Sequence, residues 1–151
     1  MPNTPDAPTR ITRYTIRHAT PADLNWLNTN QEGWTVHEYY EWGKPHSLDK
    51  AWAVLIADDQ QGNPLGWMYV VDAHDHLTPH LLYVNPEHRS QGVARALVKH
   101  LFASYDGMIL LGSWDRELFD VWTKLGFSYV PSEGEQPGSY PYGDMIRPPV
   151  R

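Results

Sequence analysis

The sequence predicts a single α/β domain in which strands and helices share one core. Residues 80–102 read as a buried strand, a tight polar turn and an amphipathic helix, because the apolar side chains change from strand spacing to helical spacing. Residues 51–57 and 65–71 are two apolar runs joined by a polar loop, which predicts a β-hairpin. The length of 151 residues suits one ordinary domain with a well-covered core.

The composition is that of a globular protein and narrows the functional classes. Hydrophobic residues make up 41% of the chain and charged residues 20%, which excludes a disordered polymer. The 12 basic and 18 acidic residues give a formal net charge of −6, which argues against nucleic-acid binding. The chain has no cysteine, so disulfides, thiolate metal sites and a cysteine nucleophile are excluded. No apolar run approaches a membrane span and no signal peptide is evident, so we expect a cytoplasmic protein without a membrane partner.

The N-terminal part divides into a lead-in and a first strand. Residues 1–12 carry three prolines among small polar residues, which predicts a flexible lead-in. Residues 13–18 alternate in polarity, which predicts a strand. We see no repeat and no further boundary, so residues 13–151 are expected to form the single domain.

Two helix starts follow the first strand. Thr20 can cap a helix, Pro21 fits the first helical position, and Asp23 stands where a capping box requires its acid. A similar pattern predicts a second short helix over residues 35–42, ended by the glycine that follows.

The remaining elements follow from the same spacing rules, with glycine and proline marking their ends. After the hairpin we expect, in order, a strand at 76–84, a helix from 93 to about 105, a strand at 108–111, a helix at 116–125 stopped by Gly126, a strand at 127–130, a glycine- and proline-rich loop at 131–141, and a final edge strand at 142–146.

The turn before the long helix has the chemistry of an anion site. A helix N-terminus presents unpaired backbone N–H groups and a partial positive charge. Gly92 lets a ligand approach that backbone closely, and Arg89 adds a full positive charge beside it. This combination predicts a pyrophosphate-binding site, which we call the cradle, formed by Arg89, Ser90, Gln91 and Gly92.

Two motifs in this region resemble those of a known family. Val84-x-Pro86-x-x-Arg89-x-x-Gly92-x-Ala94 resembles the acetyl-CoA loop of the GNAT family of N-acetyltransferases. The segment Trp122-Thr123-Lys124-Leu125-Gly126-Phe127 is similar to the family's later helix-end motif. The two motifs occur in the family's order, and the resemblance covers roughly residues 13–147.

The resemblance implies a fold, an activity and a set of binding residues. It implies a mixed, mostly antiparallel sheet flanked by helices, in which two central strands splay apart and hold acyl-CoA. It implies an N-acetyltransferase that moves an acetyl group from acetyl-CoA to a primary amine by direct attack in a ternary complex, with no metal. The implied acyl-CoA contacts are Leu82, Tyr83, Val84, Arg89, Ser90, Gln91, Gly92, Val93, Ala94, Arg95, Asp115 and Trp122.

The residue at the family's usual general-base position differs in this chain. Many relatives carry a glutamate at the position of Thr78, and threonine cannot take a proton at neutral pH. His80 lies two residues on, and the ordinary pKa of histidine is near 6.5, so His80 is the first candidate, acting directly or through a water. Alternatively, His80 only lines the cleft and hydrogen-bonds a neighbour. Glu38, Asp72 and Asp115 are further carboxylate candidates, each of which is also a natural solvated or capping residue.

The residue at the family's usual general-acid position differs as well. Where the family usually has a tyrosine, this chain has Trp122, whose indole N–H cannot release a proton. Either the thiolate leaves unassisted, or a tyrosine such as Tyr142, Tyr140 or Tyr39 reaches in, or the protein is an acyl-CoA-binding module with weak turnover. Tyr142 is the candidate for the acid role. The family's asparagine on that segment is replaced by Asp115.

The sequence indicates the class of binding partner but not its identity. His74, Asp75, His76 and His80 resemble a metal set, but most such groups are loop residues without metal, and the resembled family requires none. The expected partners are acetyl-CoA and an amine acceptor, either a small molecule or a peptide, whose identity the sequence leaves open. A homodimer remains an open interpretation.

Overall fold

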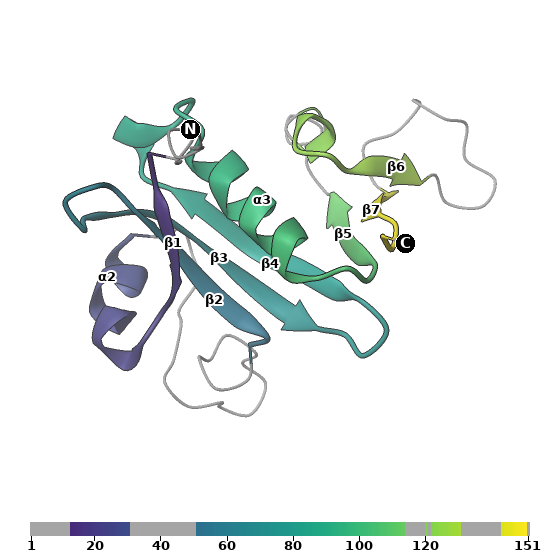
Figure 1. Ribbon diagram of the computed structural model, residues 1–151, viewed down its shortest axis with the longest axis horizontal. Coiled ribbons are helices and arrows are strands. Elements are labelled where there is room, and N and C mark those ends of the chain that lie inside the picture. The colour runs from purple at the N-terminus through teal and green to yellow at the C-terminus, as the bar shows by residue number, and fades with distance from the viewer. Residues whose placement is uncertain (1–12, 31–50, 114–119, 121, 131–142, 151) are drawn as a thin grey trace, which may run out of the picture.

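The protein is a mixed α/β domain built on one sheet. The computed structural model describes residues 13–30, 51–113, 120, 122–130 and 143–150. Within these residues seven strands form a single sheet in the order β1-β2-β3-β4-β5-β7-β6 (Figure 1). Every strand pair is antiparallel except β4 with β5, which is parallel. The predicted fold class is confirmed, while the segments 1–12, 35–42 and 131–141 lie outside the described residues.

The elements keep close to the bounds that the sequence indicates. The strands are β1 (Thr15–His18), β2 (Ala53–Asp58), β3 (Pro64–Asp72), β4 (Leu77–Val84), β5 (Ile109–Ser113), β6 (Ser128–Val130) and β7 (Gly143–Arg147). The helices are the 3-10 turns η1 (Pro21–Asp23) and η2 (Pro86–His88) and the α-helices α2 (Leu24–Thr29) and α3 (Val93–Ser104). Residues 120 and 122–124 are also helical.

The start of α2 forms as its capping pattern predicts. The Thr20 N–H donates to Oδ2 of Asp23 over 2.8 Å, and the Asp23 N–H donates to the Thr20 carbonyl over 2.8 Å. Arg17 on β1 holds both oxygens of the same carboxylate and also binds Asp58 at the end of β2 over 2.6 Å. The helix start is thereby tied to the sheet edge.

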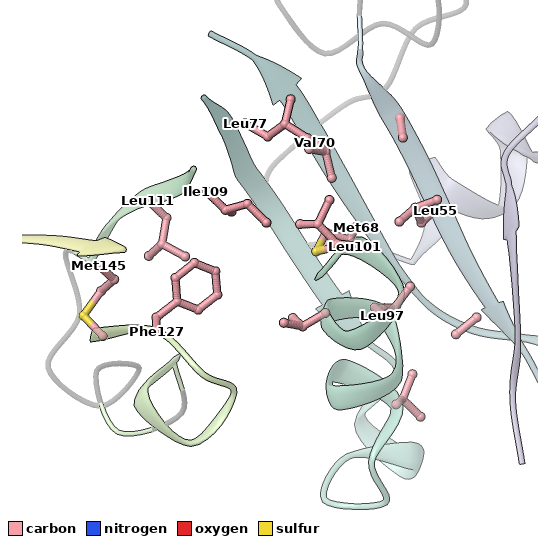
Figure 2. Close-up of a cluster of buried hydrophobic side chains, with 14 of the residues drawn as sticks. Leu55, Met68, Val70, Leu77, Leu97, Leu101, Ile109, Leu111, Phe127 and Met145 are labelled. Carbon is pink, nitrogen blue, oxygen red and sulfur yellow. The ribbon is translucent and has the colours of Figure 1, made fainter. Parts of the chain in front are cut away.

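The two faces of the sheet carry separate apolar clusters. One cluster lies under α3 and joins Leu97 and Leu101 to strand residues such as Met68 (Figure 2). The other lies on the opposite face, where Leu27 of α2 packs on Trp67. We call these the α3 face and the α2 face. Because alternate residues of β2, β3 and β4 enter one or the other cluster, these three strands are covered on both sides.

The strands β4 and β5 separate almost as soon as they meet. Their pairing joins Leu77 to Ile109, with the Leu77 N–H donating to the Met108 carbonyl over 3.1 Å. β4 then continues to Val84 paired only with β3 among the described strands, while β5 turns toward β7 (Figure 1). We call this divergence the fork. It is the splayed strand pair that the resemblance implies.

One expectation about the sheet edge was wrong. The last strand, β7, is not at the edge but lies between β5 and β6 and pairs antiparallel with both. Its Met145 is fully buried. Neighbouring strands in a sheet are not always consecutive in the chain, so strand-forming residues alone do not fix their order. β6 forms the edge instead.

Candidate functional site

The β4 strand leads into the predicted cradle through a short turn. Pro86 begins η2 because its missing N–H and fixed φ cannot continue a strand ladder. The His88 N–H closes the turn on the Asn85 carbonyl over 2.9 Å. The chain then passes through residues 89–92 and enters α3 at Val93. Strand end, loop and helix start are therefore adjacent, as the sequence predicts.

The loop takes a backbone shape that glycine favours. Gly92 is the N-cap of α3 with φ +90°, and Ser90 has φ +63°. A Cβ built on Gly92 meets no atom within 4 Å, so the backbone dihedral rather than space requires glycine here. The first intrahelical bond runs from the Ala96 N–H to the Gly92 carbonyl over 2.9 Å. The amides of residues 93–95 precede that bond and have no partner within the helix.

Arg89 folds back over the end of β4. Its Nε donates to the Val84 carbonyl over 2.8 Å, and its guanidinium carbon lies 5.4 Å from the centre of the Tyr83 ring. The structure thus brings together three residues of the predicted site. The side chain also places a positive charge at the mouth of the fork, next to the start of α3.

The β4 backbone is oriented by its bonds to β3. The Asn85 N–H donates to the Leu65 carbonyl over 2.9 Å, so this end of the ladder is fixed. Because backbone groups alternate along an antiparallel strand, Tyr83 turns its N–H and C=O toward β3, while Leu82 and Val84 turn theirs toward the fork. Leu82 is thus positioned to bond an extended ligand.

His80 occupies a β-bulge that the sequence analysis missed. Tyr69 pairs with Leu81 and Val70 pairs with Pro79, which leaves His80 as an extra residue on β4. Pro79 was the available signal, since proline within a strand occurs at edges and bulges. The bulge shifts the strand alternation, so that Leu81 joins the α2 face.

The surroundings of His80 suit a proton acceptor. Its ring contacts the buried Tyr69 ring edge-on, with 6.5 Å between the ring centres. This places His80 on the α2 face, the same face as Thr78, which pairs with Val71. The His80 side chain is exposed at the surface, and partial desolvation by its neighbours lowers the pKa of the ring below its usual 6.5. The imidazole is therefore mainly neutral at neutral pH and able to accept a proton.

Trp122 is the first residue of the second motif, and its ring packs against the cluster on the α3 face. The Gly126 N–H donates to the Thr123 carbonyl and the Phe127 N–H to the Trp122 carbonyl, each over 3.1 Å, which is the Schellman pattern. Gly126 has φ +113°, as its predicted stop role requires. The Trp122 ring is half-buried and contacts the Phe127 ring edge-on at 5.6 Å.

The other candidate residues divide into two groups. Tyr142, Asp115, Glu38, Tyr140 and Tyr39 lie outside the described residues. Asp72 accepts the His74 N–H over 2.9 Å and so caps its turn. The His76 ring binds Asp75 over 2.6 Å, and this hydrogen bond lowers the pKa of that carboxyl. Within the described ranges, no group of three or more metal-ligating side chains converges.

Comparison with known proteins identifies the family. The family model described as "Acetyltransferase (GNAT) domain" matches residues 50–129, more than half of the chain and the whole span from β2 into β6. The chain belongs to the GNAT acetyltransferase family. The match includes the loop at Arg89–Gly92 and the helix end at Gly126, the two segments that carry the resemblance. No curated protein sequence matches this GNAT domain.

Solved structures share the fold of this GNAT domain at low sequence identity. A variant of the spermidine N-acetyltransferase SpeG from Vibrio cholerae is 20% identical, with a TM-score of 0.64 over 89% of this chain and 93% of that one. Nourseothricin acetyltransferase is 18% identical, with a TM-score of 0.61 over 93% and 100%. A histone acetyltransferase HPA2-related protein from Corynebacterium glutamicum is 17% identical, with a TM-score of 0.58 over 93% and 98%. In the described part of the GNAT domain, no helix is long and apolar enough to cross a membrane.

Proposed function

We propose that this GNAT domain transfers an acetyl group from acetyl-CoA to a primary amine, by direct attack of the amine within a ternary complex. The observation that carries the proposal is the fork, which opens beside the β4 backbone and directly before the loop at the start of α3. A thioester at the end of an extended arm requires such a place, with a backbone edge to bind the arm and an anion site beside it. Residues 13–151 act as the catalytic domain in this proposal.

The binding residues have separate tasks in this proposal. Leu82 offers backbone groups to the pantetheine arm, whereas the Val84 carbonyl is already held by Arg89. The backbone amides at the start of α3 and the charge of Arg89 receive the pyrophosphate. The full proposed set is Leu82, Tyr83, Val84, Arg89, Ser90, Gln91, Gly92, Val93, Ala94, Arg95, Asp115 and Trp122.

Proton transfer is assigned to His80 and Tyr142. The amine attacks the thioester carbonyl carbon as a free base and must lose a proton as the C–N bond forms. An imidazole nitrogen of His80 accepts that proton, directly or through one water, because the ring has a lowered pKa and is mainly neutral at neutral pH. The C–S bond then breaks, and the thiolate leaves with a proton supplied by the Tyr142 hydroxyl. Trp122 cannot supply it.

The acceptor is proposed to be a cationic amine. The formal net charge of −6 attracts cations to the protein over several ångströms and raises their encounter rate at low salt. Among the relatives of similar fold, one is named for acetylating spermidine, itself an amine. A polyamine therefore belongs in the first panel of acceptors, together with peptides.

The proposal is tested by thiol release from acetyl-CoA with a panel of amines at several pH values. Wild type is expected to release thiol only when an accepted amine is present. His80→Ala is expected to lower kcat about 100-fold, the usual contribution of a general base. Release unchanged in the variant would remove His80 from the proton path while keeping the transferase.

A second function is favoured by the packing of Trp122. Its ring lies against Phe127 where the family usually places a proton donor, which fits a domain that binds acyl-CoA without rapid turnover. The same assay separates the two functions. Tight acetyl-CoA binding with no release from any amine would select the binding module.

A further inference from the structure

The loop that precedes α3 is strained and has two external tethers. Ser90 holds a left-handed φ of +63°, which costs free energy for any residue with a Cβ, and Gly92 follows at +90°. A loop in this conformation keeps its shape only when its surroundings hold it. One tether is the bond from Arg89 to the Val84 carbonyl at the end of β4.

The other tether is Tyr14, which lies immediately before β1. Its hydroxyl donates to the Gln91 carbonyl over 2.7 Å, across 77 residues of sequence. Gln91 stands between the two left-handed residues, so the bond acts at the centre of the strained segment. The Tyr14 ring packs against the cluster on the α3 face, which fixes the hydroxyl from the core side. Figure 1 shows the beginning of β1 at the same end of the sheet as the beginning of α3.

This bond also sets the direction of the next amide. No peptide bond among the described residues is cis, and in a planar trans peptide the C=O and the following N–H point in opposite directions. When the Gln91 carbonyl is held on Tyr14, the Gly92 N–H points away from Tyr14. In the chain the Gly92 N–H is followed by the amides of residues 93–95, which have no partner within the helix.

We propose that Tyr14 is a positioning residue that preorders the loop amides for the pyrophosphate of acyl-CoA. The assignment rests on the proposed function, because it requires that the loop bind this group. Tyr14 itself does not touch the reacting atoms. Its hydroxyl keeps the donors in place before the ligand arrives, so that binding does not have to order the loop.

The test compares Tyr14→Phe with wild type toward two ligands. Acetyl-CoA carries the pyrophosphate, and S-acetylpantetheine carries the same thioester arm without it. Isothermal titration is expected to show an acetyl-CoA Kd raised about five-fold in the variant, the usual worth of one hydrogen bond. The Kd for S-acetylpantetheine should stay within error, and in turnover KM for acetyl-CoA should rise with kcat unchanged.

Tyr105→Phe is the matched control, because it removes the same atom at the other end of α3. It should leave both dissociation constants unchanged. Equal weakening of both ligands by Tyr14→Phe, or lowered stability in urea without any change in ligand preference, would overturn the positioning role alone. A wild-type protein that binds neither ligand would overturn the proposed function and this assignment with it.

Discussion

His80 is distinguished from the other histidines by its place on a bulged strand. Its ring contacts the Tyr69 ring on the α2 face of the sheet, beside the stretch of β4 that has separated from β5. Desolvation lowers the pKa of its ring. The imidazole therefore stays neutral to lower pH than a fully solvated histidine does.

This pKa direction predicts the pH dependence of the reaction. In the proposed mechanism a neutral His80 accepts the proton and its protonated form cannot, so kcat/KM for the unprotonated amine should fall as the pH drops through the pKa of His80. Because that pKa lies below 6.5, activity should persist through neutral pH and be lost on the acid side of 6.5. A pH–rate profile measures it, with rates corrected for the fraction of free amine.

His100 offers the control for this profile. It lies on α3, and burial followed by the nearby His18 lowers its pKa as well. His100→Gln should leave the acid limb in place, whereas His80→Gln should abolish it. An acid limb that survives in the His80 variant would show that another group takes the proton.

At the scale of elements, two glycines serve α3 for different physical reasons. Gly66 on β3 is required because a side chain would not fit. An added Cβ would lie 2.8 Å from the Tyr83 carbonyl oxygen and 3.1 Å from Cγ1 of Val93. Gly92 is required for its backbone conformation, because the space around it is open but its φ of +90° is one that other residues rarely adopt. One allows the helix start to approach the sheet, and the other allows the chain to turn into the helix.

The two reasons predict different responses to substitution. Gly66→Ala should lower the free energy of unfolding by about 1–3 kcal/mol, the cost of overpacking a fitted contact, and Gly66→Asn should be worse. Gly92→Ala should cost about 1–2 kcal/mol, but Gly92→Asn less, because asparagine tolerates the left-handed region. Urea unfolding of the four variants measures this. Equal rescue by asparagine at both positions would contradict the distinction.

The sequence anticipates the parts of this site that are local in the chain. The loop at Arg89–Gly92 and the helix end at Gly126 follow from residues within one turn of each other, and both form as expected. The contact of Tyr14 with Gln91 could not be predicted, since nothing in a strand pattern marks a partner 77 residues away. The bulge at His80 was overlooked although Pro79 signalled it.

At the scale of the whole molecule, the fork divides the sheet into β1–β4 and β5–β7, and α3 lies over the first part (Figure 1). Leu97 and Leu101 lie near Met68 (Figure 2), and Phe102 of the same helix contacts Phe127 beside the second part, edge-on with 5.4 Å between the ring centres. The last strand was wrongly expected at the sheet edge, because its place depends on which strand pairs with β5, and tertiary contacts decide that pairing. The geometry of the fork therefore depends on contacts that join the second part to α3.

Arg147 on β7 is such a contact. Its Nη2 donates to the Tyr105 carbonyl over 2.6 Å and to the Gly107 carbonyl over 2.8 Å, just beyond the C-terminus of α3. Its guanidinium carbon lies 4.8 Å from the centre of the Phe102 ring. The side chain thus binds two backbone carbonyls of the segment that follows α3 and covers an aromatic ring of the helix itself.

Removal of this contact should loosen one part of the sheet more than the other. Arg147→Met leaves the two carbonyls without their donor and should lower the free energy of unfolding by about 2 kcal/mol. Amide hydrogen exchange should accelerate in β5 and β7 while β2 and β3, paired on both edges, keep their protection. Lys99→Met removes an exposed cation of α3 and should change neither quantity. Uniform acceleration across all strands would mean that Arg147 supports global stability without joining the two parts at the fork.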